Sequence, residues 1–265
     1  EIINEEVKDD LIEKAIEATK DQQEGTLIEE EDLTDAVSEI IVKTDTNTAA
    51  KVIEEINDIV TETNLSLEVI SAISEKDESK LNDLSENLQE EIQELTEQAI
   101  SKAENTTEDS QKIAKVVSVV NDDLVNIMVE EVSKVSTEEK QTLSAKVLKA
   151  IVDTEPTKID IINEEIKDTM IKQTIESAKN QEEGIGIQED EDLTSIVSDI
   201  IVNTDTETAS KIIEEVNNTE TDSNLSLIII SDISKKDTQK LDDLSENNQE
   251  QIQILTEQAV QNAEI

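Results

Sequence analysis

The chain contains no cysteine, histidine, tryptophan, tyrosine or phenylalanine, and all of its basic residues are lysine. It has three glycines and one proline among 265 residues. Without cysteine or histidine, it cannot form disulfides, zinc fingers or iron–sulfur clusters, and it lacks imidazole for acid–base catalysis. Without aromatic side chains it has no platform for stacking nucleic-acid bases, and without arginine it makes no bidentate phosphate contacts.

Acidic residues dominate the charge. The chain has 67 Asp and Glu against 22 basic residues, which gives a formal net charge of −45. A surface this acidic repels nucleic acid and anionic lipid, so we expect no nucleic-acid partner. No apolar run approaches the roughly 18 residues of a membrane-spanning helix, so we also expect no membrane insertion.

A long internal repeat is visible in the sequence. The segment Leu81–Asn87, for example, returns almost unchanged as Leu241–Asn247. From Asp32 to Ala103, about 46 of the 72 positions are identical to their partners 160 residues later, a level typical of recent duplication. We therefore divide the chain into a first long repeat, residues 1–159, and a second, incomplete copy, residues 160–265.

The repeat also suggests a larger context. The second copy ends in mid-period, and neither end of the sequence carries the atypical polar repeat that normally caps a solenoid array. This pattern predicts that neighbouring copies continue in a longer polypeptide.

Hydrophobic spacing predicts helices throughout the chain. Ile113, Val116, Val117 and Val120 follow the i, i+3, i+4, i+7 pattern of one helix face. Ile and Val favour strands, but Glu, Gln, Lys and Ala fill the polar positions and hairpin turn dipeptides are missing, which favours helix. The expected helices are residues 2–20, 33–43, 46–60, 65–75, 78–103, 108–120, 122–135, 138–153, 157–180, 193–203, 206–218, 225–235 and 238–263.

The expected fold class is all-α. Links of two to six residues place consecutive helices antiparallel, which gives about eight helices, or four hairpins, per period. Each hairpin has too small an aliphatic face to close a core alone, so hairpins must stack on their neighbours as an α-solenoid. The alternative is an elongated helical bundle, in which segment 78–103 would act as a longer strut.

One helix carries a family resemblance. The segment Thr48–Ile56 resembles the helices of armadillo/HEAT-type superhelices and of the acidic N-terminal superhelix of some magnesium channels. The resemblance covers a single helix built from common residue types, so we assign no family from it.

Two acidic loops at equivalent positions are the candidate metal sites. Carboxylate oxygens are the ligands that Ca²⁺ and Mg²⁺ prefer, but the spacing and central glycine of an EF-hand are absent. We therefore expect these loops to bind Ca²⁺ or Mg²⁺ weakly and non-specifically, and no dedicated cofactor. The candidate ligands are Glu30, Glu31, Asp32, Asp190, Glu191 and Asp192.

The sequence predicts no enzymatic activity. Its lysines stand among carboxylates, as Lys8 does beside Glu5, Glu6 and Asp9, which raises their basicity and favours surface ion pairs. Serine and threonine have no histidine or lysine-centred motif to activate them.

Four triplets match the glycan acceptor pattern, and helix capping explains them equally well. These triplets begin at Asn64, Asn105, Asn217 and Asn224.

Three functional hypotheses remain. The first is a structural segment of a long repetitive acidic polypeptide, forming a filament, stalk or surface layer whose partners are copies of itself. The second is an interaction scaffold that binds a basic partner, and the third is an acidic array that stores divalent cations. For the first hypothesis we expect an extracellular or cell-surface location, and otherwise a cytoplasmic one.

Overall fold

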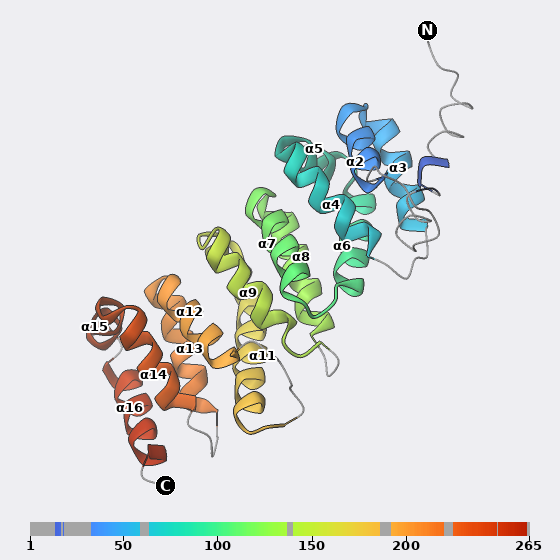
Figure 1. The fold of residues 1–265 in the computed structure, drawn as a ribbon. Helices are drawn as coiled ribbons and strands as arrows, with labels where there is room; N and C mark the ends of the chain where they lie inside the picture. The colour runs from blue at the N-terminus through green and yellow to red at the C-terminus, as the bar shows by residue number, and fades with distance from the viewer. Residues whose placement is uncertain are drawn as a thin grey trace. The chain divides into compact units, whose positions relative to one another are not determined.

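The computed structural model describes residues 14–16, 18, 33–58, 64–136, 140–185, 192–219, 225–247 and 249–263. Every regular element in these ranges is a helix, which confirms the all-α prediction (Figure 1). The expected helix 2–20 lies almost wholly outside the described residues.

Five helices of the first copy recur in the second, among the residues that the structure describes. In the first copy the helices are α2 (Leu33–Lys43), α3 (Thr46–Asp58), α4 (Leu65–Lys76), α5 (Glu78–Asn87) and α6 (Gln89–Lys102). Their counterparts 160 residues later are α12 (Leu193–Asn203), α13 (Thr206–Asn218), α14 (Leu225–Lys236), α15 (Thr238–Asn247) and α16 (Gln249–Ala263). Between the two sets lie α7 (Thr107–Val119), α8 (Asp122–Val135), α9 (Leu143–Thr154), α10 (Lys158–Ile161) and α11 (Glu164–Glu182).

The prediction of one long helix over residues 78–103 is wrong. The helix breaks at Leu88, whose backbone leaves the helical region at φ −129° and ψ 53°, so the segment divides into α5 and α6. Asn87 precedes the break, and its side-chain amide donates to the Asp83 carbonyl one turn earlier. Leu84 before the break and Ile92 after it are both buried, and neither glycine nor proline marks the break in the sequence.

The expected helix 157–180 is also divided. After Pro156 the chain forms only the single turn α10, and the long helix α11 begins at Glu164. Asn163 sets this start, because its side-chain oxygen accepts a hydrogen bond from the Glu165 amide at 3.0 Å. At the other end of α11, Gly184 adopts φ +68°, the left-handed conformation that commonly ends a helix.

The chain forms two compact units, which we describe separately. Unit 1 comprises residues 1–104 and 115–131, and unit 2 comprises residues 105–114 and 132–265. In unit 1, α2 packs on α4 and α3 packs on α6, so that two hairpins stack layer on layer. In unit 2, α9, α12 and α14 pack in succession, and α11, α13 and α16 form the second layer. Each unit is thus a stack of antiparallel helical hairpins in chain order, as predicted for an α-solenoid.

The core of each unit is made of small aliphatic side chains. In α3, for example, Ala49, Val52, Ile53 and Ile56 are buried at the spacing of one helix face. Each buried Ile or Leu contributes roughly 1.5–3 kcal/mol from removal of its surface from water. Because each helix buries this face against helices of the adjacent hairpin, the stability of one hairpin depends on the next.

Candidate functional site: the polar links between successive hairpins

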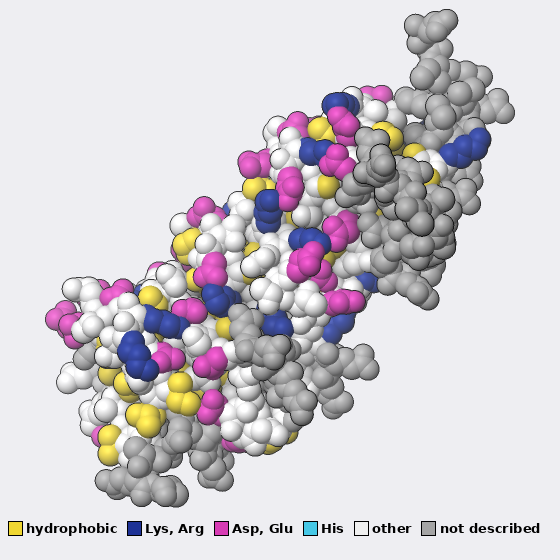
Figure 2. All heavy atoms as spheres, in the orientation of Figure 1, with side chains coloured by type: hydrophobic (Ala, Val, Ile, Leu, Met, Phe, Trp, Pro, Cys, Tyr) yellow, Lys and Arg dark blue, Asp and Glu magenta, His cyan; other side chains and the backbone are white. Residues whose placement is uncertain are grey.

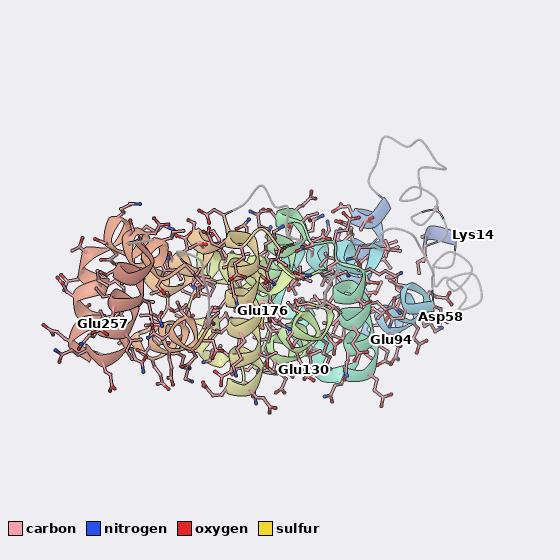
Figure 3. All side chains as sticks on the ribbon, turned by 90° about the horizontal axis from the view of Figure 1, so that it is seen from below. Lys14, Asp58, Glu94, Glu130, Glu176 and Glu257 are labelled. Atoms are coloured by element: carbon pink, nitrogen blue, oxygen red, sulfur yellow. The ribbon has the colours of Figure 1, made fainter. Side chains whose placement is uncertain are left out.

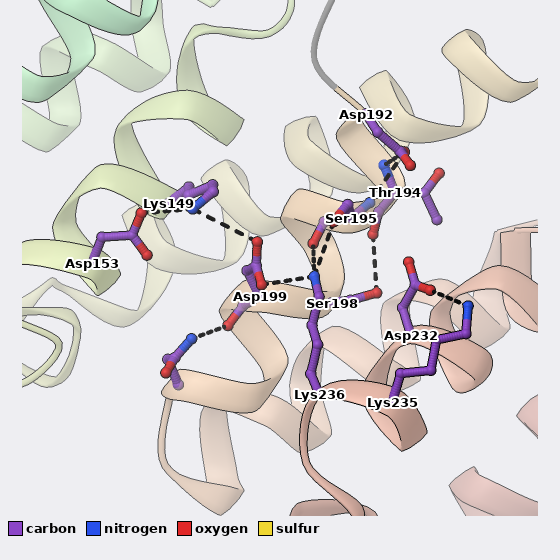
Figure 4. Close-up of polar contacts among 11 residues, drawn as sticks. Lys149, Asp153, Asp192, Thr194, Ser195, Ser198, Asp199, Asp232, Lys235 and Lys236 are labelled. Atoms are coloured by element: carbon purple, nitrogen blue, oxygen red, sulfur yellow. Dashed lines mark hydrogen bonds and ion pairs between the residues drawn. The ribbon is translucent and has the colours of Figure 1, made fainter.

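The predicted metal ligands lie mostly outside the described residues. This applies to Glu30, Glu31, Asp32, Asp190 and Glu191. Asp192 is described, and its carboxylate caps α12 by accepting the amides of Thr194 at 3.0 Å and Ser195 at 3.2 Å (Figure 4). Over the described ranges, no group of three or more acidic side chains is placed to hold a metal ion. Weak Ca²⁺ or Mg²⁺ binding at these loops therefore stays a prediction.

A glutamine on the second helix of a hairpin connects two successive hairpins. In unit 1, Gln98 of α6 donates its side-chain amide to the Asn57 carbonyl of α3 at 2.7 Å. Its side-chain oxygen accepts the hydroxyl of Ser66, at the start of α4, at 3.3 Å. We call this arrangement the glutamine link: a serine, a glutamine of the same hairpin, and a backbone carbonyl of the preceding hairpin.

The glutamine link recurs twice in unit 2. Gln173 of α11 accepts the Ser144 hydroxyl at 2.7 Å and donates to the Ser133 carbonyl of α8 at 2.8 Å. Gln258 of α16 accepts the Ser226 hydroxyl at 2.9 Å and donates to the Asn217 carbonyl of α13 at 3.1 Å. The three serines are buried, so each hydroxyl is satisfied inside the stack. The link therefore fixes the register of one hairpin on the next.

Asparagines that follow the sequence repeat add a second connection. Asn57 donates its side-chain amide to the Glu91 carbonyl at 3.0 Å, and its counterpart Asn217 donates to the Gln251 carbonyl at 2.9 Å. Asn64 caps α4 and donates to the Ala99 carbonyl at 2.8 Å. These contacts occupy the amide nitrogen that glycosylation would need at Asn64 and Asn217, and capping accounts for the Asn64 triplet as expected.

Lysines also bind backbone carbonyls at helix ends. Lys80 donates to the Thr44 carbonyl that follows α2, at 2.9 Å, and Lys240 donates to the Thr204 carbonyl that follows α12, at 2.5 Å. A cation at this place is favoured by the negative end of the helix dipole. Burial lowers the pKa of the Lys240 amine, although nearby carboxylates such as Asp205 oppose this. Lys240 is therefore an exception to the prediction that lysines form surface ion pairs.

Asp199 of α12 joins three consecutive hairpins in unit 2. Its carboxylate lies 3.6 Å from the Lys149 amine of α9 and 2.7 Å from the Lys236 amine of α14 (Figure 4). Lys236 also donates to the Ser195 hydroxyl at 2.9 Å. The Asp199 side chain is 24% exposed, so its ion pairs are less screened by water than pairs on an open surface.

Unit 1 also has an ion pair between the two equivalent helices, but its acidic residue lies one helical turn earlier. Lys76, the counterpart of Lys236, pairs with Asp35 of α2 at 2.7 Å, and this hydrogen bond raises the pKa of the Lys76 amine. The position equivalent to Asp35 is Ser195, and the position equivalent to Asp199 is Glu39. The lysine is thus retained in both copies, whereas its acidic partner has moved by four residues.

Two carboxyl groups meet where α10 approaches the start of α13. Asp205 caps α13, accepting the amides of Glu207 and Thr208 and the Thr208 hydroxyl. Burial by itself raises the pKa of Asp205, but these hydrogen bonds and the one with Asp160 outweigh it and lower the pKa to about 2. The hydrogen bond with Asp205 raises the pKa of Asp160.

Replacing Gln98 with alanine tests the glutamine link. The change leaves the Asn57 carbonyl without its donor, and we expect the free energy of unfolding to fall by about 1–3 kcal/mol. Gln93→Ala is the matched control, because Gln93 is also on α6 but is exposed, and its side-chain amide donates to Glu97 of the same helix. Urea denaturation followed by circular dichroism measures both variants. Equal losses for the two variants would show that the link contributes nothing beyond helix propensity.

Replacing Asp205 with alanine removes the α13 cap, and we expect a loss of about 0.5–2 kcal/mol at pH 7. A folded pKa of about 2, below the ordinary 3.8, means that ionised Asp205 stabilises the fold above pH 4. This contribution is lost as the pH falls from about 4 toward 2, so the deficit of the variant should shrink over that range.

Asparagine at position 205 provides the control for this pH dependence. Asn keeps an oxygen that can accept the Glu207 and Thr208 amides but not the second acceptor used by the Thr208 hydroxyl, and it does not titrate. The Asp205→Asn variant should therefore lose less stability than Asp205→Ala at pH 7. Urea midpoints between pH 3 and pH 7 give the comparison. A deficit of the alanine variant that stays constant across this range would contradict the assignment.

Described residues line one cavity in each unit. In unit 1, a groove of 230 Å³ lies between α5, α6 and α8. Asn121 at its rim accepts the Leu124 amide at 3.0 Å and donates to the Ser85 hydroxyl at 3.2 Å, so both ends of its side-chain amide are engaged. In unit 2, an apolar cavity of 10 Å³ lies among α9, α11, α12 and α13.

Carboxylates cover the outer surface of the second helices. Glu94 of α6 and Glu130 of α8 are exposed in unit 1, and Glu176 of α11 and Glu257 of α16 are exposed in unit 2 (Figure 3). On the face shown in Figure 2, acidic side chains alternate with lysines.

Comparisons with known proteins leave the family open. No protein-family model matches the chain, and neither curated proteins nor solved structures gave a significant match. Of the helices that the structure describes, none is both long enough and apolar enough to cross a membrane.

Proposed function

We propose that this chain is a structural, non-catalytic segment of a long repetitive acidic polypeptide that forms an extended filament, stalk or surface-layer element. The observation that carries the proposal is the recurrence of the glutamine link at Gln98, Gln173 and Gln258. In each link the glutamine amide donates to a backbone carbonyl of the preceding hairpin, and this contact supports a role in stacking one hairpin on another.

The variation between the copies supports the same proposal. Exposed positions differ freely, as where Glu94 is replaced by the half-buried Ile254, while the Ser–Gln pair of the link is identical in both copies. A high negative charge keeps such an array soluble and discourages non-specific association.

The test measures length against the number of repeats. Proteins that contain one, two and three tandem 160-residue units should show maximum dimensions, by small-angle X-ray scattering, that increase by equal steps. Electron microscopy of the native polypeptide should show an axial period set by the same unit. A maximum dimension that grows only as the cube root of mass would mean that the units collapse into a globule, and the proposal would fail.

The scaffold hypothesis predicts a different result when the native polypeptide is purified. An array that acts as a scaffold would hold a basic protein in stoichiometric amount through purification at physiological salt. Native arrays that carry such a partner at every period would replace the structural proposal with the scaffold one.

A further inference from the structure

The last hairpin of unit 2 exposes an apolar face that is buried in unit 1. In unit 1, Leu67, Ile70, Leu81, Ile92 and Ile100 are each at most 1% exposed. Their counterparts in α14, α15 and α16 are Leu227, Ile230, Leu241, Ile252 and Val260, which we call the terminal face. Leu227 is 36% exposed and Val260 is 55% exposed, and the other three are half-buried. Figure 2 shows hydrophobic side chains over α14 and α16.

Residues 115–131 of α7 and α8 pack on the corresponding face in unit 1. Asn82 of α5 donates to the Val119 carbonyl at 3.1 Å and accepts the Asn121 amide at 2.8 Å. Lys115 of α7 pairs with Glu75 of α4, and Leu124 of α8 lines the same groove as Ile92. Within the described part of unit 2, no segment occupies this place on α14–α16.

We propose that the terminal face binds a helical hairpin of the α7–α8 type, carried by the same polypeptide directly after α16. In the first copy only four residues separate the end of α6 from the start of this hairpin, so a hairpin joined to α16 in the same way is held at high local concentration. A second copy of the chain is the weaker occupant, because two chains of net charge −45 repel each other.

The residues around the terminal face specify the charge of the hairpin. Lys235 stands where unit 1 has Glu75, so the position equivalent to Lys115 should be acidic. Asp242 stands where unit 1 has Asn82, and its carboxylate can accept the amide that begins the second helix of the hairpin but cannot donate to the first.

This inference deepens the proposed function, because a continuing stack requires a partner of this kind for each end hairpin. It rests directly on the burial difference between the two copies, so the two proposals can fail separately.

The experiment extends the chain by one hairpin. Residues 105–136 are appended after Glu264 in place of Ile265, once unchanged and once with glutamate at the position of Lys115. We expect hydrogen exchange of the α14 and α16 amides to slow by at least about tenfold in both extended proteins, because Leu227 and Val260 become buried. The glutamate version should be the more protected, and Lys235→Glu should reverse this order.

The control extension carries serine at the positions of Ile113, Val116, Val117 and Val120, and it should leave exchange at α14 and α16 unchanged. Unchanged exchange with the apolar extensions would overturn the proposal. So would a dimer of the unextended chain that protects α14 and α16 and is abolished by Val260→Glu, because the occupant would then be a second copy. If the extension protects α14 and α16 but tandem units fail to lengthen in equal steps, only the proposed function fails.

Discussion

Replacing Ile175 with alanine is expected to lower the free energy of unfolding by about 2–5 kcal/mol. Ile175 lies on α11 and is 1% exposed, and it lines the small apolar cavity together with Leu148 of α9 and Val197 of α12. The substitution enlarges a void where helices of successive hairpins meet, and the surrounding helices can only partly close it. Urea denaturation gives the loss, and hydrogen exchange should place it in α9, α11 and α12.

Ile185 supplies the matched control for this experiment. It has the same side chain and lies just after α11, but it is 56% exposed. Ile185→Ala should change stability by no more than about 0.5 kcal/mol. If both variants lost the same amount, burial between hairpins could not be the source of stability.

Raising the concentration of NaCl from 20 mM to 300 mM is expected to stabilise the fold. The formal charge of −45 creates self-repulsion that the folded state concentrates, and salt screens it. A gain of about 2 kcal/mol would raise the midpoint of thermal unfolding by about 4–8 °C in a chain of this size. The ion pairs of Asp199 oppose this trend, because salt weakens them, but they are few beside the excess of carboxylates.

Magnesium at matched ionic strength separates screening from binding. If divalent cations only screen the charge, MgCl₂ and NaCl should raise the midpoint by similar amounts at equal ionic strength. A much larger effect of MgCl₂ would indicate specific sites, for which the loops that contain Asp32 and Asp192 are the first candidates. A midpoint that falls as NaCl is added would contradict the dominance of self-repulsion.

Helix positions could be predicted well where capping and periodicity agree. The helices 33–43, 122–135, 193–203 and 206–218 have the expected bounds. Asn64 caps α4, which accounts for its glycan-acceptor triplet as expected, and Asp77 caps α5. The break at Leu88 could not be foreseen, because neither glycine nor proline stands there and no side chain caps α6 at this position.

The polar links were not predicted, and the reason is their spacing. The partners of Gln98 lie 32 and 41 residues away, and many serines and glutamines stand at such distances by chance. Identity between the copies, as for Ser66 and Ser226, is a usable signal. This signal is missing for the Gln173 link, in which the serine lies 29 residues from the glutamine. The metal-site prediction for the acidic loops rests on their composition. Acidic composition alone does not indicate how the carboxylates are arranged in space.

The shifted acidic partner of Lys76 and Lys236 has a consequence for correct folding. Tandem copies with this much identity are prone to exchange segments with the wrong copy. A hairpin that inserted α14 beside α2 would present Lys236 to Asp35 and Glu39, and one that inserted α4 beside α12 would find serine at position 195. Because the lysine is the same in both copies, an exchanged lysine would still meet Asp35 on α2 or Asp199 on α12, so this ion pair does not distinguish the native order from an exchanged one. Fidelity of assembly must therefore come from positions whose chemistry differs between the copies, such as Glu75 and Lys235.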